Sequence, residues 1–412
     1  MLNQKQAILI LALIVGGLAF ISFGHAQGPP GTNYDEAKVG NYTLPDPLVF
    51  NDGAPVRSAS DWTRRRRGEV LELFATNVFG HSPAAPKKLN YEVFDTDQNA
   101  LGGKAIRKQI TIYFSPSKDG PKEDILLYLP KEARKPVPVF LILSFSGNQT
   151  ATSETAIKLG TAWNPRTRQK SQAPEDSRGR GQADTERILA RGYGYATINY
   201  VDIEPDFRGG YLYGLRRLFF KPGQVEPAPD EWGAIGAWSY GLSRALDYFE
   251  KDKDIDAKRV AIVGHSRLGK TVLWAGSIDT RFAMIISSCS GEGGASLSRR
   301  NYGETVKDLV NPARYPYWFT TEYQKFADNE AKLPVDMHEL IALIAPRPVY
   351  ITAGETDRWA DPKGEFLAAV AAGPVFRLLG GQDLGTDQMP ALDQPIMKSL
   401  AFHIHTGGHS IT

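Results

Sequence analysis

The stretch VAIVGHSRLGKTVLW, residues Val260–Trp274, places a serine at the junction of two sequence patterns. Val260–Val263 is short, apolar and rich in β-branched residues, which predicts a buried strand. Gly264 follows, and a helical pattern begins near Leu268. A strand, a tight turn and a helix in this order predict that the turn exposes Ser266 to a reactant.

The residue after this serine is unusual for such a turn. The common motif is G-x-S-x-G, but here the second glycine, Gly269, comes one residue late and Arg267 follows the serine. Attack by a serine on an ester carbonyl builds negative charge on the carbonyl oxygen, which a preorganised donor stabilises. We interpret Arg267 as a charged donor to that oxygen; the alternative is an ion pair that only anchors the turn.

Patterns that predict strands alternate with patterns that predict helices from about residue 61 onward. Strands are expected at 108–114, 124–130, 137–147, 192–200, 282–291 and 348–357, and a helix at 234–251. Such alternation is typical of a parallel sheet covered on both faces. We therefore predict an α/β-hydrolase fold, a three-layer sandwich with a mostly parallel central sheet, in one catalytic domain over residues 61–412.

A serine nucleophile needs a base and an acid that orients the base, and in this fold class the chain order is serine, acid, histidine. Asp357 follows the strand expected at 348–357, and His409 follows the flexible pair Gly407–Gly408. We predict the triad Ser266, Asp357 and His409. The other carboxylates and histidines in these two regions are Glu355, Asp361, His403 and His405.

Charge and composition exclude several other functions. Lys+Arg 48 nearly balances Asp+Glu 46, which argues against a general nucleic-acid binder. The arginine run in Thr63–Gly80 is interpreted as the solvated face of an amphipathic helix. His403 and His405 alternate in a strand-like run without a nearby acid, so no metal site and no cofactor are expected.

The N-terminus has the layout of a secretory signal. MLNQKQ carries one lysine, 17 uncharged residues follow, and Gly24 and Ala26 are small. We predict a signal peptide over residues 1–26, with an uncleaved anchor as the alternative. Residues 27–60, rich in Pro, Gly, Asn and Asp, predict an irregular lead-in. The one cysteine, Cys289, allows no intrachain disulfide. We expect a periplasmic or secreted protein without a stable membrane partner after cleavage.

The segment VGHSRLGKTVLWAGSIDTRF resembles the nucleophile region of the glucuronoyl esterases, carbohydrate esterase family fifteen. Their signature is G-C-S-R-x-G-K, and His265 here replaces the cysteine. The similarity extends to LSFSGNQT, RGYGYATINYVDIEPD, LSRRNYGET and GETDRWADPKGEF, and so covers roughly residues 61–412. The resemblance implies hydrolysis of esters between 4-O-methyl-glucuronic acid side chains of xylan and lignin alcohols, with glucuronoxylan or a lignin–carbohydrate ester as substrate.

The same resemblance implies individual roles. Ser266 is the nucleophile, His409 the base and Asp357 the acid. Arg267 matches the family arginine whose side chain helps to stabilise the oxyanion. Lys270 matches a lysine that hydrogen-bonds a sugar hydroxyl. Glu304 and Trp359 match positions that bind the uronic acid ring.

Two features depart from the family pattern. Fungal members place the acid after the strand that follows the serine helix, and that position is Cys289 here, whereas many bacterial members use the later acid, matched by Asp357. Glu292, three residues on, is a candidate second acid. The chain also stops three residues after His409, where family members continue into a C-terminal helix, so we expect either that this helix is missing or that the sequence is truncated.

Three other functions remain open from the sequence. An acetyl xylan or other carbohydrate esterase would have a small, blocked pocket without Lys270, Glu304 and Trp359. A hydrolase-fold binding protein would have lost its activity, which an intact triad argues against. A peptidase of the same fold would cleave amides.

Overall fold

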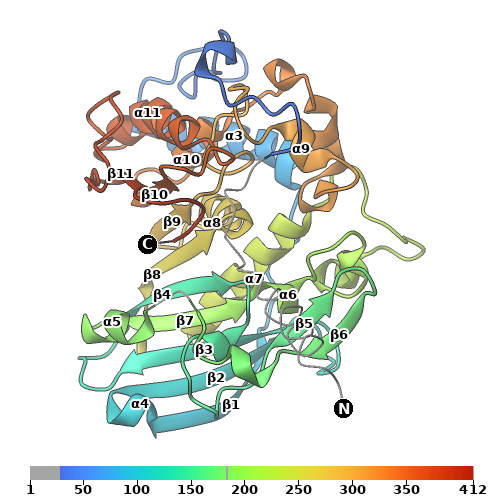
Figure 1. Cartoon of the computed structure of the whole chain (residues 1–412), viewed down its shortest axis with the longest axis vertical. Coiled ribbons are helices and arrows are strands. Elements are labelled where there is room, and N and C mark those ends of the chain that lie inside the picture. Colours follow the sequence, from blue (N-terminus) through green and yellow to red (C-terminus); the bar gives the residue numbers. More distant parts are fainter. Residues whose placement is uncertain (1–27, 182–183, 412) are drawn as a thin grey trace, which may run out of the picture.

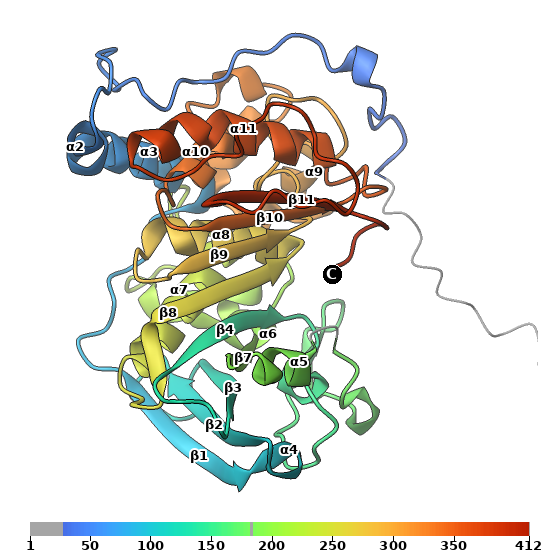
Figure 2. The same cartoon turned by 90° about the vertical axis from the view of Figure 1, so that its left-hand side faces the viewer.

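A computed structural model describes residues 28–181 and 184–411, so the predicted signal peptide lies outside the described residues. Nine strands form one sheet in the order β1-β2-β3-β7-β4-β8-β9-β10-β11 within this part of the chain. Figure 2 shows them following one another from β1 at the bottom to β11 near the top. Their bounds are β1 Asn90–Asn99, β2 Ala105–Tyr113, β3 Lys122–Pro130, β4 Val137–Ser144, β7 Gly194–Asn199, β8 Ile255–His265, β9 Met284–Ser288, β10 Val349–Gly354 and β11 Leu400–His405.

The sheet is antiparallel at one edge and parallel elsewhere. β1, β2, β3 and β7 pair antiparallel in that order, whereas β7, β4, β8, β9, β10 and β11 pair parallel. The carboxyl ends of the parallel strands therefore meet at one edge, where ligands bind in open α/β sheets. A separate hairpin, β5 Thr161–Asn164 with β6 Gln169–Gln172, lies between β4 and β7 in the sequence.

Helices complete the structure around the sheet (Figure 1). The α-helices are α2 Ala59–Asp61, α3 Arg67–Phe74, α4 Ala100–Gly103, α5 Thr185–Ala190, α6 Tyr200–Ile203, α7 Ala234–Phe249, α8 Arg267–Ile278, α9 Val306–Val310, α10 Met337–Ala342 and α11 Pro362–Leu378. Two π-helical segments are Trp62–Arg66 and Ala75–Phe79. Short 3-10 turns are Glu36–Lys38, Asn148–Thr150, Glu175–Ser177, Gly210–Leu212, Leu215–Phe219, Pro316–Trp318, Thr321–Phe326 and Glu330–Lys332.

Alternation along β3 shows how both faces of the sheet are covered. Ile125 and Leu127 belong to the main buried cluster, which includes the buried apolar residues of α7 and α8. Leu126 and Tyr128, which point the other way, pack in a smaller cluster with Leu189 of α5. The predicted three-layer α/β-hydrolase sandwich with a mostly parallel sheet is therefore confirmed.

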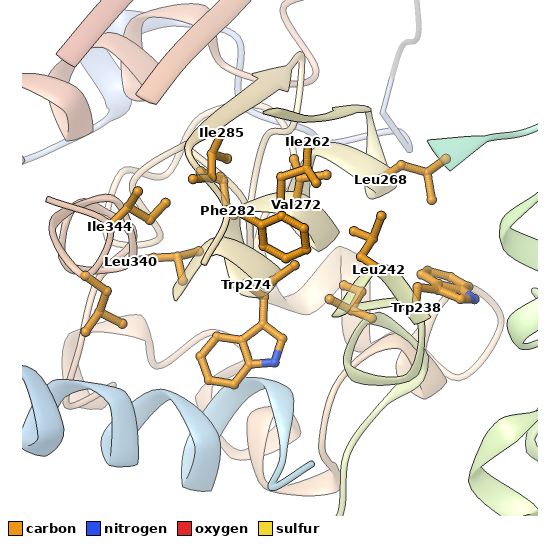
Figure 3. Packing of buried hydrophobic residues seen from close by; sticks show 14 of the residues in the cluster. Trp238, Leu242, Ile262, Leu268, Val272, Trp274, Phe282, Ile285, Leu340 and Ile344 are labelled. Carbon is orange, nitrogen blue, oxygen red and sulfur yellow. The ribbon is translucent and has the colours of Figure 1, made fainter. Parts of the chain in front are cut away.

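The main core surrounds the strand–turn–helix unit from β8 to α8. Leu268, Val272 and Trp274 of α8 are buried with Ile262 of β8. Figure 3 shows these residues gathered around Phe282, with side chains of α7 and α10 on either side. Because this core fixes the start of α8 against the end of β8, the serine between them has a rigid support.

Arg64 and Arg65 are exposed as predicted, but the prediction of a solvated face is wrong for Arg66 and Arg67. Arg66 is 4% exposed and donates a 3.0 Å hydrogen bond to the carboxylate of Glu339. Arg67 donates to the main-chain oxygens of Ser277 and Leu343. Burial of these guanidinium groups is compensated by acceptors on other elements, which the local pattern could not reveal.

The lead-in segment after residue 27 packs on two loops near the sheet edge (Figure 2). The oxygen of Asn33 accepts a 2.9 Å bond from the N–H of Gly303, and Glu36 pairs with both Arg300 and Lys363. A Cβ at Gly28 would lie 2.0 Å from the ring of Trp359. The segment therefore supports two loops. One carries Glu304, which follows Gly303 in the sequence, and the other carries Trp359, whose ring lies beside Gly28.

Among residues 28–181 and 184–411, no helix combines the length and the apolarity needed to cross a bilayer. Residues 406–411, which follow β11, form no helix.

Candidate active site

Ser266 lies at a strained turn between β8 and α8. Its backbone has φ 57° and ψ −128°, a conformation that residues with a side chain rarely adopt. The turn closes tightly, because a Cβ at Gly264 would lie 2.0 Å from the oxygen of Leu268. At Gly269 a Cβ would come within 2.9 Å of Ser290, so the late glycine is needed where α8 passes close to the segment after β9.

His409 and Asp357 are brought together by the ends of β10 and β11. Nδ1 of His409 lies 2.6 Å from Oδ2 of Asp357, which is the distance of a charge-assisted hydrogen bond. The Asp357 side chain is fully buried, whereas that of His409 is 31% exposed. A buried carboxylate that holds one ring nitrogen leaves the other nitrogen available for proton transfer.

Close main-chain packing places the loop that carries His409. A Cβ at Gly354, the last residue of β10, would lie 2.0 Å from the oxygen of Gly408. The oxygen of Gly407 also accepts a 3.0 Å bond from the N–H of Thr356. The predicted Gly-Gly loop is therefore held against the end of β10 beside Asp357, and Gly354 is the glycine that the close approach requires.

Ser266 and His409 line one cavity of about 210 Å³ at the carboxyl ends of the parallel strands. Their side chains form no direct hydrogen bond in this structure, and such catalytic bonds often tighten only in a substrate complex. The remaining lining residues are Arg267, Lys270, Cys289, Ser290, Gly291, Glu304, Arg314, Tyr315, Trp318, Trp359 and Ala360. The cavity thus contains every predicted site residue except Asp357, which lies behind His409, and Glu292.

Arg267 is both an ion-pair partner and a potential donor. Its Nη1 donates to Oδ2 of Asp206 at 2.8 Å and to Tyr200 at 3.4 Å. Burial would lower the pKa of Arg267, but the Asp206 carboxylate raises that pKa above its ordinary value. Nε and Nη2 have no acceptor among the described residues, and the side chain is 27% exposed. The two alternatives from the sequence are therefore compatible, because anchoring uses only one nitrogen.

Asp206 was not predicted as a site residue, although it is the last residue of the family-like stretch RGYGYATINYVDIEPD. Its Oδ1 accepts from Tyr317 at 2.9 Å and from Trp318 at 2.7 Å, and its Oδ2 accepts from Tyr200 and Arg267. Four donors on one buried carboxylate fix the position of the guanidinium. Only the fold brings these donors together, so no spacing in the sequence indicates them.

Lys270 lines the cavity, but its donors are used within the protein. Nζ donates to the main-chain oxygens of Ser290 at 2.7 Å and Glu292 at 2.5 Å, and to Oε2 of Glu304 at 3.0 Å. An ammonium group has three donors, so all of them are committed in this structure. Oε1 of Glu304 has no hydrogen-bond partner among the described residues. Lys270 therefore presents Glu304 to the cavity.

Trp359 forms an aromatic wall of the same cavity and is 9% exposed. The guanidinium of Arg314, a lining residue that sequence reasoning missed, lies 5.0 Å from the Trp359 ring centroid. Nη1 of Arg314 is buried without a hydrogen bond and lies 3.7 Å from Oδ1 of Asp308. An aromatic face beside charged donors suits a sugar ring with hydroxyl groups.

The structure does not bring Glu292 to His409. Its Oε1 accepts from Tyr323 at 2.6 Å and from Ser298 at 2.7 Å, and Lys270 takes only its main-chain oxygen. Burial raises the pKa of the Glu292 carboxyl to about 8. The carboxylate of Glu292, the candidate second acid, is therefore held by hydrogen bonds within the protein and does not contact His409.

The remaining acids and histidines of the two regions have other contacts. Asp361 caps α11 and accepts a 2.9 Å hydrogen bond from Nε of Arg300. Oε1 of Glu355 lies 3.5 Å from the N–H of Gly407. His403 and His405 lie within β11 as expected. Asp357 is therefore the acid that the structure places on His409.

Cys289 lies beside the pair at the position of the fungal acid. Its Sγ, a carboxylate oxygen of Asp357 and a ring nitrogen of His409 lie within 4.8 Å of one another, a spacing that could hold a metal ion. Burial raises the pKa of the Cys289 thiol well above its ordinary value. Asp357 and His409, the other two members of this group, already pair with each other at 2.6 Å through Oδ2 and Nδ1. The donor set suits a histidine–carboxylate pair better than a metal centre.

His265, which replaces the family cysteine, packs against the candidate base. The ring centroids of His265 and His409 lie 4.6 Å apart. Burial, with His409 next to it, lowers the pKa of His265 to about 3. His265 is thus neutral at ordinary pH and does not place a second positive charge beside His409.

Several known proteins are similar to this chain in sequence over most of its length. A sequence profile described as "Glucuronyl esterase, fungi" matches residues 226–380. The carbohydrate esterase MZ0003 of an unknown prokaryotic organism is 46% identical over 419 residues, which cover 99% of this chain and 95% of the relative. A 4-O-methyl-glucuronoyl methylesterase of Phanerochaete carnosa is 27% identical over 92% of this chain and 82% of its own length.

Solved structures show the same similarity. A glucuronoyl esterase from Solibacter usitatus superposes with a TM-score of 0.88 at 51% identity, covering 92% of this chain and 96% of the other. A structure described as a promiscuous CE15 esterase from the marine bacterial metagenome gives a TM-score of 0.84 at 47% identity, covering 93% and 96%. Both similarities extend over more than nine tenths of this chain.

Proposed function

Since the chain belongs to the glucuronoyl esterases of carbohydrate esterase family fifteen, we propose that it is a serine esterase that hydrolyses esters of glucuronic acid. The finer part of the proposal is the substrate: the ester that joins a 4-O-methyl-glucuronic acid side chain of xylan to a lignin alcohol. Relatives described as 4-O-methyl-glucuronoyl methylesterases and glucuronoyl esterases support the uronate half of this assignment.

The proposed reaction uses Ser266, His409 and Asp357. His409 accepts the hydroxyl proton as Ser266 attacks the ester carbonyl, and Asp357 stabilises the resulting imidazolium through the 2.6 Å hydrogen bond. His409 then returns the proton to the leaving alcohol. Water, activated by His409 in the same way, hydrolyses the glucuronoyl-serine ester and releases the uronic acid.

Two donors are proposed to stabilise the oxygen that becomes negative in this step. The N–H of Arg267 is the first of α8, so it has no acceptor within the helix. The Arg267 side chain adds a positive charge with nitrogens that Asp206 does not use. An oxyanion donor lowers the barrier by about 3–4 kcal/mol, as measured by deleting such donors. A hydrogen bond from a charged donor is about twice as strong as one from a neutral donor.

Recognition of the sugar falls to the other side of the cavity. Glu304 offers an unpaired carboxylate oxygen to a hydroxyl, and Trp359 offers an aromatic face. Lys270 acts by holding Glu304, a role that differs from the direct hydrogen bond to a hydroxyl implied by the resemblance. A general lipase would have no use for these groups.

The observation that carries the proposal is the His409–Asp357 pair in a cavity that also exposes Ser266 and Glu304. It is tested by comparing turnover of benzyl D-glucuronate, p-nitrophenyl acetate and a peptide amide. We expect kcat/KM to be highest for the glucuronate. A preference for acetate would favour an acetyl xylan or other carbohydrate esterase, cleavage of the amide a peptidase, and no turnover an inactive binding protein.

The proposal extends to location. The N-terminal pattern of a lysine, an uncharged run and small residues supports export by a signal peptide over residues 1–26. We place the mature enzyme in the periplasm or outside the cell, where plant cell-wall polymers or their fragments are found. N-terminal sequencing of the exported protein tests this, with residue 27 expected as the first residue.

A further inference from the structure

His265, the last residue of β8 and the direct neighbour of Ser266, begins a polar row that crosses the sheet. The strand register places Ser288 of β9 opposite His265, and Thr352 of β10 opposite Ser288. Residues in register on parallel strands point to the same face, so these three side chains form a line at the carboxyl ends of the strands. The row therefore starts beside the nucleophile and reaches β10, the strand that precedes Asp357.

The middle hydroxyl of this row, that of Ser288, determines which ring nitrogen of His265 carries a proton. Oγ of Ser288 donates to the main-chain oxygen of Ser410 at 3.4 Å and accepts from Oγ1 of Thr352 at 3.2 Å. Nδ1 of His265 lies 3.2 Å from the same Oγ. A hydroxyl group has one proton and two lone pairs, so the second lone pair is left for an N–H of His265. Nδ1 of His265 is therefore the donor, and the fully buried Ser288 holds the ring from one side.

The ring of His265 also contacts two other rings. Its centroid lies 4.6 Å from that of His409, at an interplanar angle of 50°. The ring of Phe145 lies 6.4 Å away on the same measure and is nearly perpendicular, at 88°. Rings separated by about 4.5–7 Å attract one another when they are tilted or edge to face. Because His265 is neutral, a proton that arrives on His409 meets an uncharged ring there.

His409 is consequently held at three points, of which Asp357 supplies only one. Asp357 fixes Nδ1 of the His409 ring through the 2.6 Å hydrogen bond. His265 contacts the ring itself, and Ser288 holds the main-chain oxygen of Ser410, the next residue along the chain. A single hydrogen bond leaves a ring free to swing about it, whereas a contact on the side of the ring limits that swing. Catalytic groups need such support, because they must stay within about 0.5 Å of the productive geometry.

Building on the proposed function, we propose that His265 is a positioning residue for the general base, which it holds by ring contact in the orientation that lets Nε2 of His409 reach the Ser266 hydroxyl. His265 does not line the cavity, so it acts through His409 and not on the substrate. Ser288 assists by fixing both the His265 ring and Ser410. The histidine that replaces the signature cysteine thereby has a role in the reaction.

Steady-state kinetics on methyl D-glucuronate and p-nitrophenyl acetate provide the first test. His265→Ala removes the ring contact, so kcat should fall by about tenfold to a hundredfold on both esters, the cost of a slightly misplaced catalytic group. KM should change little, because His265 contacts no part of the substrate. His265→Phe retains a ring and should keep most of the wild-type kcat. An unchanged kcat in His265→Ala, a loss mainly in KM, or an equal loss in His265→Phe would overturn the proposal.

The matched control is His403→Ala. His403 continues the same row on β11, in register with Thr352, but its ring lies parallel to that of Tyr350 and its Nδ1 lies 3.1 Å from the Tyr350 hydroxyl. This variant should keep the wild-type kcat, and a loss as large as that of His265→Ala would contradict a specific role for His265. If His265→Ala fails to fold, Ser288→Ala removes the hydroxyl that holds the His265 ring and should lower kcat in the same direction.

A spectroscopic measurement separates positioning from a general effect on the structure. In protein made with isotope-labelled histidine, the Nδ1 proton of His409 in its short bond to Asp357 should give a far-downfield NMR signal, identified by its loss in His409→Gln. That signal should broaden or disappear in His265→Ala and persist in His265→Phe and His403→Ala. A signal that is unchanged in His265→Ala, or absent from wild type, would overturn the proposal.

The two proposals fail in different ways. Wild-type enzyme that hydrolyses neither ester would overturn the proposed function, and the NMR measurement would still decide whether His265 positions His409. Active wild-type enzyme beside an equally active His265→Ala protein would overturn only the positioning role.

Discussion

Asp206 holds the guanidinium of Arg267 through a 2.8 Å ion pair, and the same carboxylate also accepts hydrogen bonds from two tyrosines and a tryptophan. The charge beside Ser266 is thereby fixed before substrate arrives. A preorganised charge needs no reorganisation when the oxyanion forms, which is the main source of its catalytic effect. The position of the Arg267 side chain thus depends on a residue outside the triad.

Substituting Asp206 tests this dependence. Asp206→Asn removes the negative charge and leaves Arg267 free to move, so kcat should fall at least about tenfold on every ester, with KM little changed. Steady-state kinetics on methyl D-glucuronate and p-nitrophenyl acetate would measure it. Asp256→Asn, at a surface pair with Arg259, is the control and should retain full activity. Unchanged kcat in Asp206→Asn would show that Arg267 does not act on the oxyanion.

The assignment of the acid gives a second prediction. Asp357→Asn should lower kcat by roughly 10⁴, the scale reported for loss of the orienting charge in a serine triad. Glu355→Gln, two residues away with only a 3.5 Å contact to Gly407, should be nearly neutral. The same assays decide the matter. A mild Asp357→Asn together with a severe Glu292→Gln would place the acid at the other carboxylate.

Glu292 also predicts a pH dependence of stability. Burial raises the pKa of this carboxyl from 4.5 to about 8. Between these values the unfolded chain loses its proton while the folded chain keeps it, so this group makes the free energy of unfolding fall as pH rises from about 4.5 to about 8. The slope is at most about 1.4 kcal/mol per pH unit.

Urea unfolding of wild type and Glu292→Gln at about pH 5 and about pH 8 measures this contribution. The variant has no ionisable group there, so its stability relative to wild type should increase with pH. A difference independent of pH would show that Glu292 is ionised in the folded protein throughout this range.

The Lys270–Glu304 pair yields a prediction about coupling. Lys270→Met leaves the Glu304 carboxylate without its partner in a buried setting, which typically costs about 3–5 kcal/mol. Lys270→Met with Glu304→Gln removes that unpaired charge, so the double variant should unfold at a higher temperature than the single Lys270 variant.

Kinetics separate recognition from stability in the same variants. Glu304→Gln should raise KM for methyl D-glucuronate and leave p-nitrophenyl acetate nearly unaffected, because acetate has no hydroxyl groups to bind. Equal losses on both substrates would assign Glu304 a structural role.

The stability prediction has its own contradicting result. Additive effects of the Lys270 and Glu304 substitutions on the unfolding temperature would show that the pair is not coupled.

The sequence predicted those parts of the site whose signals are local. The β-branched run before Gly264 and the helical pattern after Ser266 indicate the turn, and the chain order of Asp357 and His409 indicates the pair. Boundaries of the strands differ by a few residues, because strand ends depend on pairing partners that lie far apart in the sequence. The strand β1 was missed for a different reason, because its polar and exposed residues give no apolar pattern.

Side-chain contacts between distant elements could not be predicted in this way. The three acceptors of Lys270 lie in the segment after β9 and at Glu304, and no spacing fixes which donors they use. Arg66, placed by pattern on a solvated face, is buried on Glu339 instead. Asp206 and Arg314 became visible as site residues only when the fold placed them beside Arg267 and Trp359.

The most direct test of the central claim is hydrolysis of benzyl D-glucuronate by wild type and by Ser266→Ala, with thermal unfolding of both proteins measured in parallel. Removal of the attacking oxygen from an exposed turn should abolish turnover, by at least about a thousandfold, and leave the unfolding temperature close to that of wild type. Retention of more than a few per cent of the wild-type rate by a folded Ser266→Ala protein would contradict the assignment of Ser266 as the nucleophile.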